Sequence, residues 1–280
     1  MLPNSAQDMT RHLPKHVPNN SFKGTAHCGA RSKRHCIMLC PRPAVGGPLT
    51  QALGPSQMSR KLDSYKGMLT AEQVAAGMTA AAENAGRLVA DAELLLENGS
   101  FATAVSLSAL AIEESGKVSI LRSIAVAKSE DEAKACWKDY RSHTRKNASW
   151  VFPELFANGA RQLEHFKAMF FDDSDHTAVL DNLKQLGFYT DCLGKAHWAR
   201  PTEVIDEKLA RSIVGIAKIM ARPTVHSARE VELWIQHIGP VWKQEMTLMK
   251  QGLVDWQAAM HREGLSKTAA DDMKSFVFGL

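Results

Sequence analysis

Apolar residues recur every three or four positions along most of the chain after residue 69, and short polar stretches divide this pattern into segments. Such spacing places the apolar side chains on one face of an α-helix. The first two segments, 71–97 and 101–128, are separated by Asn98-Gly99-Ser100, a sequence typical of a helix end followed by a tight turn. The pattern therefore predicts two long helices that form a hairpin.

Further helices are expected after this hairpin. Ser129 can cap one of them, Pro153 lies near the first turn of another, and Gly239-Pro240 is expected to kink the last long helix. The segment 193–201 has no helical period and is expected to be a loop. The further helical segments are 129–147, 153–171, 176–191, 202–221, 227–262 and a short one that begins at Ser266.

Strand-like alternation does not extend over any long stretch, so the fold class is expected to be all-α. We expect an up-and-down helical bundle over 69–201. The C-terminal helices, 202–280, are expected to pack on the same bundle.

Residues 1–68 differ in composition from the rest. They hold seven of the eleven prolines and show no helical periodicity, so we expect a disordered N-terminal extension. An alternative is that Met58 or Met68 is the true start of the protein. This segment carries ten Lys or Arg and two Asp, a net charge of +8, so the overall +4 leaves −4 for the remainder. Net charge therefore does not indicate a nucleic-acid partner.

The chain has five cysteines, an odd number, and their distribution is not that of a disulfide framework, so a reducing cytoplasm fits best. No apolar run approaches the ~20 residues that a membrane span needs, and we expect a protein without a membrane partner. We expect no metal and no cofactor, because the one group of zinc-type ligands matches no known finger or ribbon spacing. That group comprises His27, Cys28, His35, Cys36 and Cys40.

Two acids interrupt the apolar stripes of the predicted hairpin. Asp91 follows Leu88 by three positions, and Glu114 lies seven positions after Leu107, so both are expected to project from the apolar face. A buried carboxylate needs a cation, and Lys117 or Arg141 could provide it. The pair indicates either an ion network that fixes the two helices or a site with perturbed pKa values.

Glu113 and Lys117, four residues apart, are expected to form a weak pair on the exposed side of the second helix. Beyond it, the segment 137–146 is dense in groups that bind phosphate or transfer protons. Arg141 could bind a phosphate and His143 could transfer a proton, but positions two apart point about 200° away from each other on a helix. The two can meet on one phosphate only if the helix unwinds there or a second subunit supplies one of them. The alternative is a solvated basic helix end.

Aromatic and polar residues gather at the end of the segment 176–191 and in the loop that follows. Tyr189, Asp191, His197 and Trp198 could stack on a nucleobase and hydrogen-bond to it, as in proteins that bind single-stranded RNA. The alternative is that these aromatics pack the loop onto the bundle.

Three motifs in this order resemble the AbiV family of abortive-infection proteins, a branch of the HEPN superfamily. They are the hairpin that ends in Glu113-Glu114-Ser115-Gly116-Lys117, the sequence WKDYRSHTRK, and the sequence LKQLGFYTDCLGKAHWARP. The matching positions are Asp91, Ala104, Glu113, Glu114, Gly116, Lys117, Arg141, His143, Lys146, Tyr189, Asp191, Trp198 and Pro201. The resemblance implies an α-helical bundle, often dimeric, in a bacterial antiphage system whose members commonly cut or bind RNA without metal.

The chain departs from the usual HEPN nuclease signature, in which four to six residues lie between an arginine and the histidine that follows it. After residue 68, Arg141 and His143 have one residue between them, and the other close pairs have three. Ribonuclease activity on tRNA or mRNA is therefore expected by analogy, with Arg141 on the phosphate, His143 transferring protons and Glu114 orienting a basic neighbour. Asp91, Glu113, Lys117, Lys146, Tyr189, Asp191 and Trp198 would complete the polar centre and binding surface. The competing expectation is a non-enzymatic interaction module that binds a phage or host protein, and a homodimer is expected in either case.

Overall fold

The computed structural model describes residues 63–170 and 175–279, apart from the side chains of residues 168 and 170. The part of the expected disordered extension before residue 63 lies outside the described residues, and so does the group of zinc-type ligands at which no metal was expected. In the described part, Lys66 onwards forms one compact unit. Its elements are α2 (Ala71–Glu97), α3 (Phe101–Ala125), α4 (Glu130–Arg141), α5 (His143–Lys146), α6 (Phe152–Ala157), η1 (Leu163–Phe170), α7 (His176–Phe188), β1 (Asp191–Leu193), β2 (His197–Ala199), α8 (Pro201–Val204), α9 (Glu207–Met220), α10 (Ala228–Ile238), α11 (Met246–Arg262) and α12 (Ala270–Phe278).

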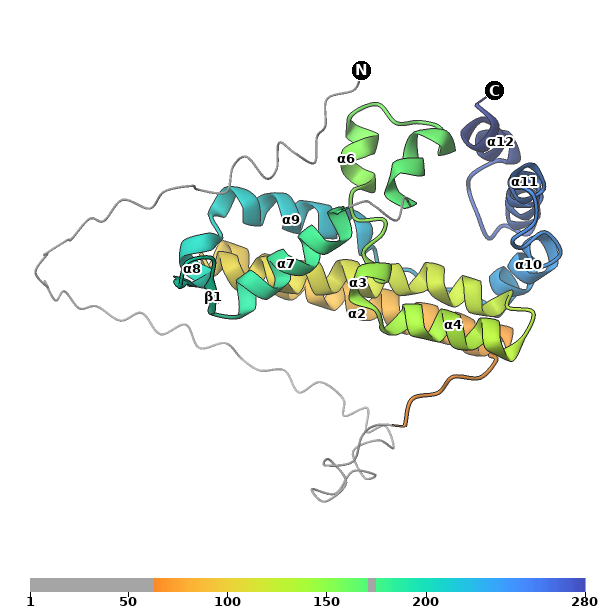
Figure 1. Ribbon diagram of the computed structural model, residues 1–280. Coiled ribbons are helices and arrows are strands. Elements are labelled where there is room, and N and C mark those ends of the chain that lie inside the picture. The colour runs from red at the N-terminus through yellow and green to blue at the C-terminus, as the bar shows by residue number, and fades with distance from the viewer. Residues whose placement is uncertain (1–62, 171–174, 280) are drawn as a thin grey trace, which may run out of the picture. The chain divides into compact units, whose positions relative to one another are not determined.

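Helices α2 and α3 form the predicted hairpin (Figure 1). Thr70 begins α2 with a capping box, in which its side chain accepts from the Gln73 backbone and the Gln73 side chain accepts from the Thr70 backbone. The turn needs the left-handed conformation at Gly99, where φ is +74°. Alanines are buried along both helices, so the two backbones approach closely.

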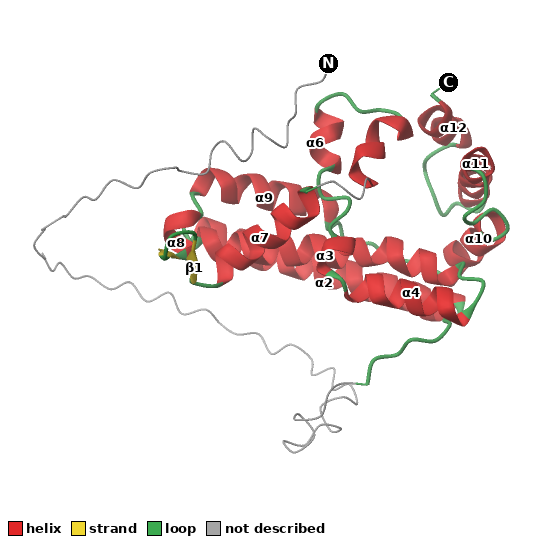
Figure 2. Ribbon diagram, in the orientation of Figure 1, coloured by secondary structure: helices red, strands yellow, loops and turns green. Residues whose placement is uncertain are grey.

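Helices α7 and α9 lie beside α3 and cover the apolar core, and the fold is all-α as expected (Figure 2). The contact between α3 and α7 is close at Gly187, where an added Cβ would lie 2.2 Å from Ser106 Oγ. Ser106 Oγ also donates to the carbonyl oxygen of Lys184 at 3.0 Å. This contact fixes the position of α7 relative to α3. The largest core cluster includes Leu88, Val105, Ile112, Trp150, Leu180 and Ile213.

The segment expected to be a loop contains a small antiparallel hairpin, β1–β2, with Cys192 opposite Trp198. The expectation of a loop without regular structure was therefore wrong at this point, while the all-α fold class holds. Three-residue strands are too short to show a readable alternation of apolar and polar residues.

Helix boundaries also differ from the expectation. The helix expected over 153–171 is α6 followed by the 3-10 helix η1, because Gly159 has a φ of +98° and ends α6. The expected kink at Gly239-Pro240 is instead a full break between α10 and α11. Within this break, the backbone of Lys243 has a positive φ. The segment 202–221 is likewise interrupted before Asp206, whose side chain caps α9 by accepting from Leu209 N at 2.8 Å.

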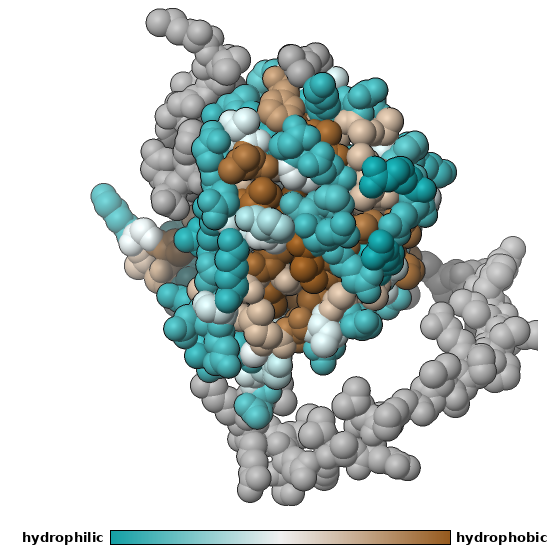
Figure 3. Space-filling view, turned by 90° about the vertical axis from the view of Figure 1, so that its right-hand side faces the viewer, coloured by the Kyte–Doolittle hydropathy of each residue, from teal (hydrophilic) through white to brown (hydrophobic). Residues whose placement is uncertain are grey.

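Helices α10–α12 complete the described chain. Arg122 of α3 binds Glu230 of α10 at 2.6 Å, and its guanidinium lies 5.5 Å from the Trp234 ring centroid and 5.3 Å from that of Trp256. An ion pair covered by two aromatic rings therefore joins α10 and α11 to α3. Figure 3 shows the side of the molecule that lies on the right in Figure 1. On this face, apolar residues gather in the middle and polar residues surround them.

Within the described residues, none of the helices is both long enough and apolar enough to cross a membrane.

Candidate functional site

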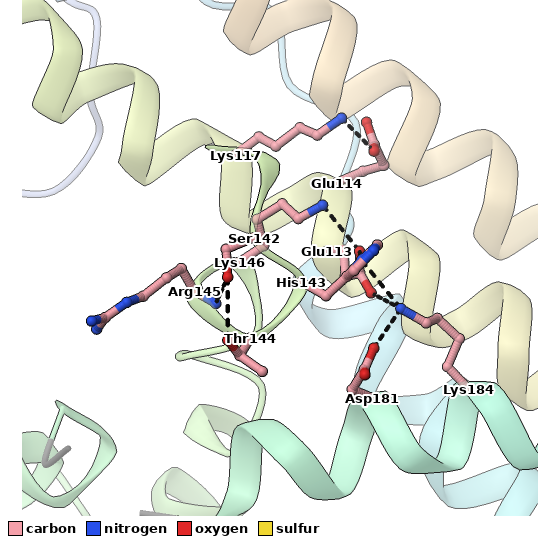
Figure 4. Close-up of polar contacts among 10 residues, drawn as sticks. All are labelled: Glu113, Glu114, Lys117, Ser142, His143, Thr144, Arg145, Lys146, Asp181 and Lys184. Carbon is pink, nitrogen blue, oxygen red and sulfur yellow. Dashed lines mark hydrogen bonds and ion pairs between the residues drawn. The ribbon is translucent and has the colours of Figure 1, made fainter. Parts of the chain in front are cut away.

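A cluster of charged side chains lies where α3, α5 and α7 meet (Figure 4). Glu113 comes from α3, His143 and Lys146 from α5, and Asp181 and Lys184 from α7. Three elements far apart in the sequence therefore supply one polar centre.

Glu113 is the centre of this cluster, with its side chain only 3% exposed. Its Oε1 accepts from Lys184 Nζ at 2.6 Å, and its Oε2 contacts His143 Nδ1 at 2.7 Å and Lys146 Nζ at 3.1 Å. Lys184 Nζ also contacts Asp181 Oδ1 at 2.6 Å. Two carboxylates and two ammonium groups balance each other, which is the condition under which charges can be buried.

His143 differs from the other members because its side chain is 55% exposed. A carboxylate can only accept, so the contact with Glu113 requires a proton on Nδ1. Lys184 Nζ lies 3.2 Å from the same nitrogen and directs its protons to the two carboxylates instead. In the neutral imidazole, Nδ1–H then leaves Nε2 as a proton acceptor.

The backbone between α4 and α5 places His143 in this position. Ser142 has φ −80° and ψ 129°, an extended conformation that ends α4 after Arg141 and starts a new turn at His143. The Ser142 side chain caps that turn by accepting from Arg145 N at 3.4 Å. The helix is thus interrupted between Arg141 and His143.

Gly116 lets α5 approach α3. A Cβ added at Gly116 would lie 2.0 Å from the carbonyl oxygen of Lys146, and that oxygen belongs to the backbone. The Glu-Glu-Ser-Gly-Lys motif therefore has a physical reason: Glu113 binds α5 and α7, Gly116 makes room for α5, and Lys117 pairs with Glu114 at 2.5 Å.

Replacement of Gly116 with alanine is expected to lower the free energy of unfolding by about 1–3 kcal/mol or more, because α5 must move away from α3. Urea unfolding measures this effect. Gly215 of α9 is the matched control, since an added Cβ there meets no atom within 4 Å. Gly215→Ala is expected to stabilise the protein by about 0.5–1 kcal/mol. Equal unfolding curves for the wild type and Gly116→Ala would contradict this account.

Burial by itself raises the pKa of the Glu113 carboxyl, but hydrogen bonds from Lys184 and His143 and the charge of Lys146 outweigh burial and hold that pKa below its ordinary value of 4.5. Burial likewise lowers the pKa of Lys184, but hydrogen bonds to Asp181 and Glu113 outweigh it and hold that pKa above 10.5. Both groups are therefore charged in the folded protein near neutral pH.

These shifts predict how stability depends on pH. The depressed pKa of Glu113 contributes stability above about pH 4.5, and this contribution is lost as the pH falls through the lower folded-state value. The raised pKa of Lys184 contributes stability below about pH 10.5 that is lost as the pH rises through the folded-state value. Urea unfolding between about pH 7 and 3 should show a steeper loss for the wild type than for Glu113→Gln. Parallel curves would disprove the assignment.

The structure corrects the expected roles of the acids. Asp91, expected to be buried, is 47% exposed and pairs with Arg87 at 3.0 Å on the surface of α2. Glu114 is 18% exposed and pairs with Lys117, whose ammonium lies 5.0 Å from the Tyr140 ring centroid. Glu113, expected on the exposed side, is the buried acid. Adjacent residues on a helix point about 100° apart, so an error of one residue in the assumed buried face of α3 explains why Glu113 and not Glu114 is the buried acid.

The other expected site residues lie in three places. Arg141 lies on Trp137, 5.3 Å from its ring centroid, and donates to the Trp137 carbonyl at 2.9 Å. Lys146, by contrast, joins the cluster at Glu113. Tyr189 and Trp198 are exposed at the β1–β2 hairpin, and Asp191 Oδ1 accepts from the Cys192 backbone at 2.7 Å.

Asp181 and Lys184 were not among the residues selected from the sequence. A signal was present, because Lys184 lies on the same face as Leu180, Leu183 and Gly187, which are all buried. A lysine on an apolar stripe indicates a buried charge for the same reason as an acid does.

Glu113, His143 and Asp181 also have the residue types of a metal site, with one ligand atom of each within 4.8 Å of the others. Lys184 Nζ contacts both carboxylates, so a divalent cation would have to displace this ammonium group. The arrangement therefore favours charge balance by lysine.

The fold and this cluster define a class: an all-α bundle in which a buried carboxylate holds an exposed histidine. A family model described as AbiV, of the HEPN_AbiV type, matches residues 73–222, which is more than half of the chain and includes every member of the cluster. The chain belongs to the AbiV family, a group of HEPN-type abortive-infection proteins. No curated protein and no solved structure gives a significant match.

Proposed function

We propose that this protein is a metal-independent endoribonuclease and that its cleavage of tRNA or mRNA in the cytoplasm halts translation and phage growth. One observation supports the proposal above all others: the half-exposed His143 ring is held through Nδ1 by the buried Glu113 carboxylate. A carboxylate that fixes the tautomer of a histidine and leaves its second nitrogen accessible is a common arrangement for general base catalysis.

In the proposed reaction, His143 Nε2 takes the proton of a ribose 2′-hydroxyl. The 2′-oxygen then bonds to the adjacent phosphorus, the bond from phosphorus to the 5′-oxygen breaks, and that oxygen takes a proton from water. The imidazolium returns its proton to the hydroxide that is left, which restores the neutral His143. The products are a 2′,3′-cyclic phosphate and a 5′-hydroxyl. Glu113 stabilises the imidazolium that forms, and in this role it replaces the Glu114 of the sequence-based expectation.

Exposed arginines flank the proposed base. Arg141 and Arg145 lie two residues before and after His143, and all three side chains are exposed. Arg145 contacts Asp139 only at 3.7 Å, with both side chains at least half exposed, so this pair is weak. Arginine binds phosphate with two parallel hydrogen bonds, so these side chains are suited to hold the RNA backbone.

The test is incubation of the purified chain with total RNA and with tRNA, with and without EDTA. Cleavage that persists in EDTA and leaves 5′-hydroxyl ends, which polynucleotide kinase labels without prior phosphatase treatment, is the expected result. Absence of cleavage would favour the alternative, a non-enzymatic module that binds a phage or host protein.

A further inference from the structure

The end of α7 and most of the β1–β2 hairpin form one uninterrupted exposed segment. All eleven residues from Phe188 to Trp198 are exposed. Trp198 is 65% exposed and Tyr189 is 62% exposed, although both are large aromatic side chains. An isolated two-stranded hairpin is only marginally stable in water, and this one also leaves its aromatics in solvent.

The register of the hairpin determines where Trp198 points. Ala199 is only 4% exposed, so the β2 face that carries Ala199 is turned towards the protein. Side chains alternate between the two faces of a strand, so Trp198 points away from the bundle, beside the exposed Cys192 on β1. Tyr189 lies at the junction of α7 and the hairpin, with its ring centroid 6.1 Å from that of Phe188.

The hairpin is directly continuous with the candidate site. Helix α7 carries Asp181 and Lys184, and Phe188 follows Lys184 by four residues, which is about one turn or ~6 Å along the helix. The chain therefore enters the hairpin segment about one helical turn beyond Lys184, whose ammonium lies 3.2 Å from His143 Nδ1, so an RNA strand with a phosphate at His143 is expected to continue towards the hairpin.

Hydrogen-bond donors beside the aromatic rings favour RNA over an apolar partner. Lys195 and His197 are exposed within the hairpin, and the carboxylate of Asp191 is engaged by the backbone N–H of Cys192. Exposed aromatic rings next to a lysine and other hydrogen-bond donors are the combination with which proteins bind unpaired bases and their phosphates.

We propose that the hairpin is a binding site for single-stranded RNA, in which unpaired bases stack on Trp198 and Tyr189 beside the site at His143. This inference rests on the proposed function for its substrate class. It adds that the substrate is unpaired at the positions next to the cleaved bond.

The experiment measures binding separately from cleavage. Every protein is the full chain with His143→Ala, so that the RNA stays intact, and the probe is a short fluorescein-labelled RNA without secondary structure. Fluorescence anisotropy gives the Kd for this RNA and for the same RNA annealed to its complement. The variants are Trp198→Ala, Trp198→Phe, Tyr189→Ala and Phe156→Ala. Phe156 is the matched control, because it is an exposed aromatic of α6 whose ring is already covered by Arg161 at 4.0 Å.

Trp198→Ala is expected to raise the Kd for single-stranded RNA roughly 5- to 150-fold, with a smaller loss for Tyr189→Ala. Trp198→Phe should restore most of the affinity, Phe156→Ala should leave it unchanged, and the duplex should bind weakly to every variant. Circular dichroism and urea unfolding confirm that the variants are folded.

Three results would overturn the inference: an unchanged Kd in Trp198→Ala, an equal loss for single-stranded and duplex RNA, or a Trp198→Ala variant that changes only the sedimentation coefficient. The last result would identify the hairpin as an interface between two copies of the chain. Failure of the proposed function gives a different result. If the wild type does not cleave RNA but Trp198→Ala still weakens RNA binding, the hairpin remains an RNA-binding site although the protein is not a ribonuclease.

Discussion

Replacing His143 with alanine is expected to reduce the rate of RNA cleavage by about 10²–10⁴-fold, the range usually contributed by a positioned general base. The variant loses the only imidazole that Glu113 holds among the described residues. Because His143 is half exposed, its removal should change stability little, and the unfolding midpoint in urea checks this point. The rate is measured on a labelled RNA under single-turnover conditions.

Two further variants make the His143 result specific. His261→Ala removes an exposed histidine of α11 outside the cluster and is expected to retain full activity. Loss of cleavage in His143→Ala but not in His261→Ala, with both purified in the same way, excludes a contaminating nuclease. Arg141→Ala should reduce cleavage if Arg141 binds the phosphate. If His143→Ala cleaves as fast as the wild type, His143 is not the base and the proposed mechanism is wrong.

Replacing Glu113 with alanine is expected to lower the free energy of unfolding by about 3–5 kcal/mol, because it leaves buried cations without their carboxylate. Lys184 and Lys146 are 6% and 8% exposed, so water cannot fully replace the lost contacts. The variant should also lose cleavage activity, since the His143 ring is no longer held. Urea unfolding at neutral pH measures the loss of stability.

Glu114→Ala is the matched control for the neighbouring carboxylate. Its partner Lys117 keeps the Tyr140 ring beside it, so a loss of about 1 kcal/mol or less is expected. Similar losses for the two variants would contradict the assignment of Glu113 as the buried centre. A double variant, Glu113→Leu with Lys184→Met, should recover part of the stability without activity, because it removes both charges together.

The helical hairpin could be predicted from the sequence because its signals are local. The capping box at Thr70 and Gln73, the left-handed Gly99 and the alanine-rich stripes all act within a few residues. Such signals do not depend on what the helix packs against. The same holds for the cap at Ser129, whose side chain accepts from Glu132 N at 3.2 Å.

The candidate site could be predicted only in part. The motifs selected His143, Lys146 and Glu113, but the wrong one of two adjacent acids was expected to be buried. Which face of α3 is covered depends on α5 and α7, and these helices come from sequence 30 and 71 residues away, the separations of His143 and Lys184 from Glu113. No periodicity within α3 carries that information.

Local sequence signals specify most of the helix-forming segments and the turn at Gly99, and the sequence supplies the acids, lysines and histidine of the site. Contacts between elements far apart in the sequence show three further features: Ser142 interrupts the helix before His143, Gly116 leaves room for the Lys146 backbone, and Lys184 neutralises Glu113. The physical reason is that caps and turns depend on neighbouring residues, whereas the burial of a charge is decided by the groups that surround it in space.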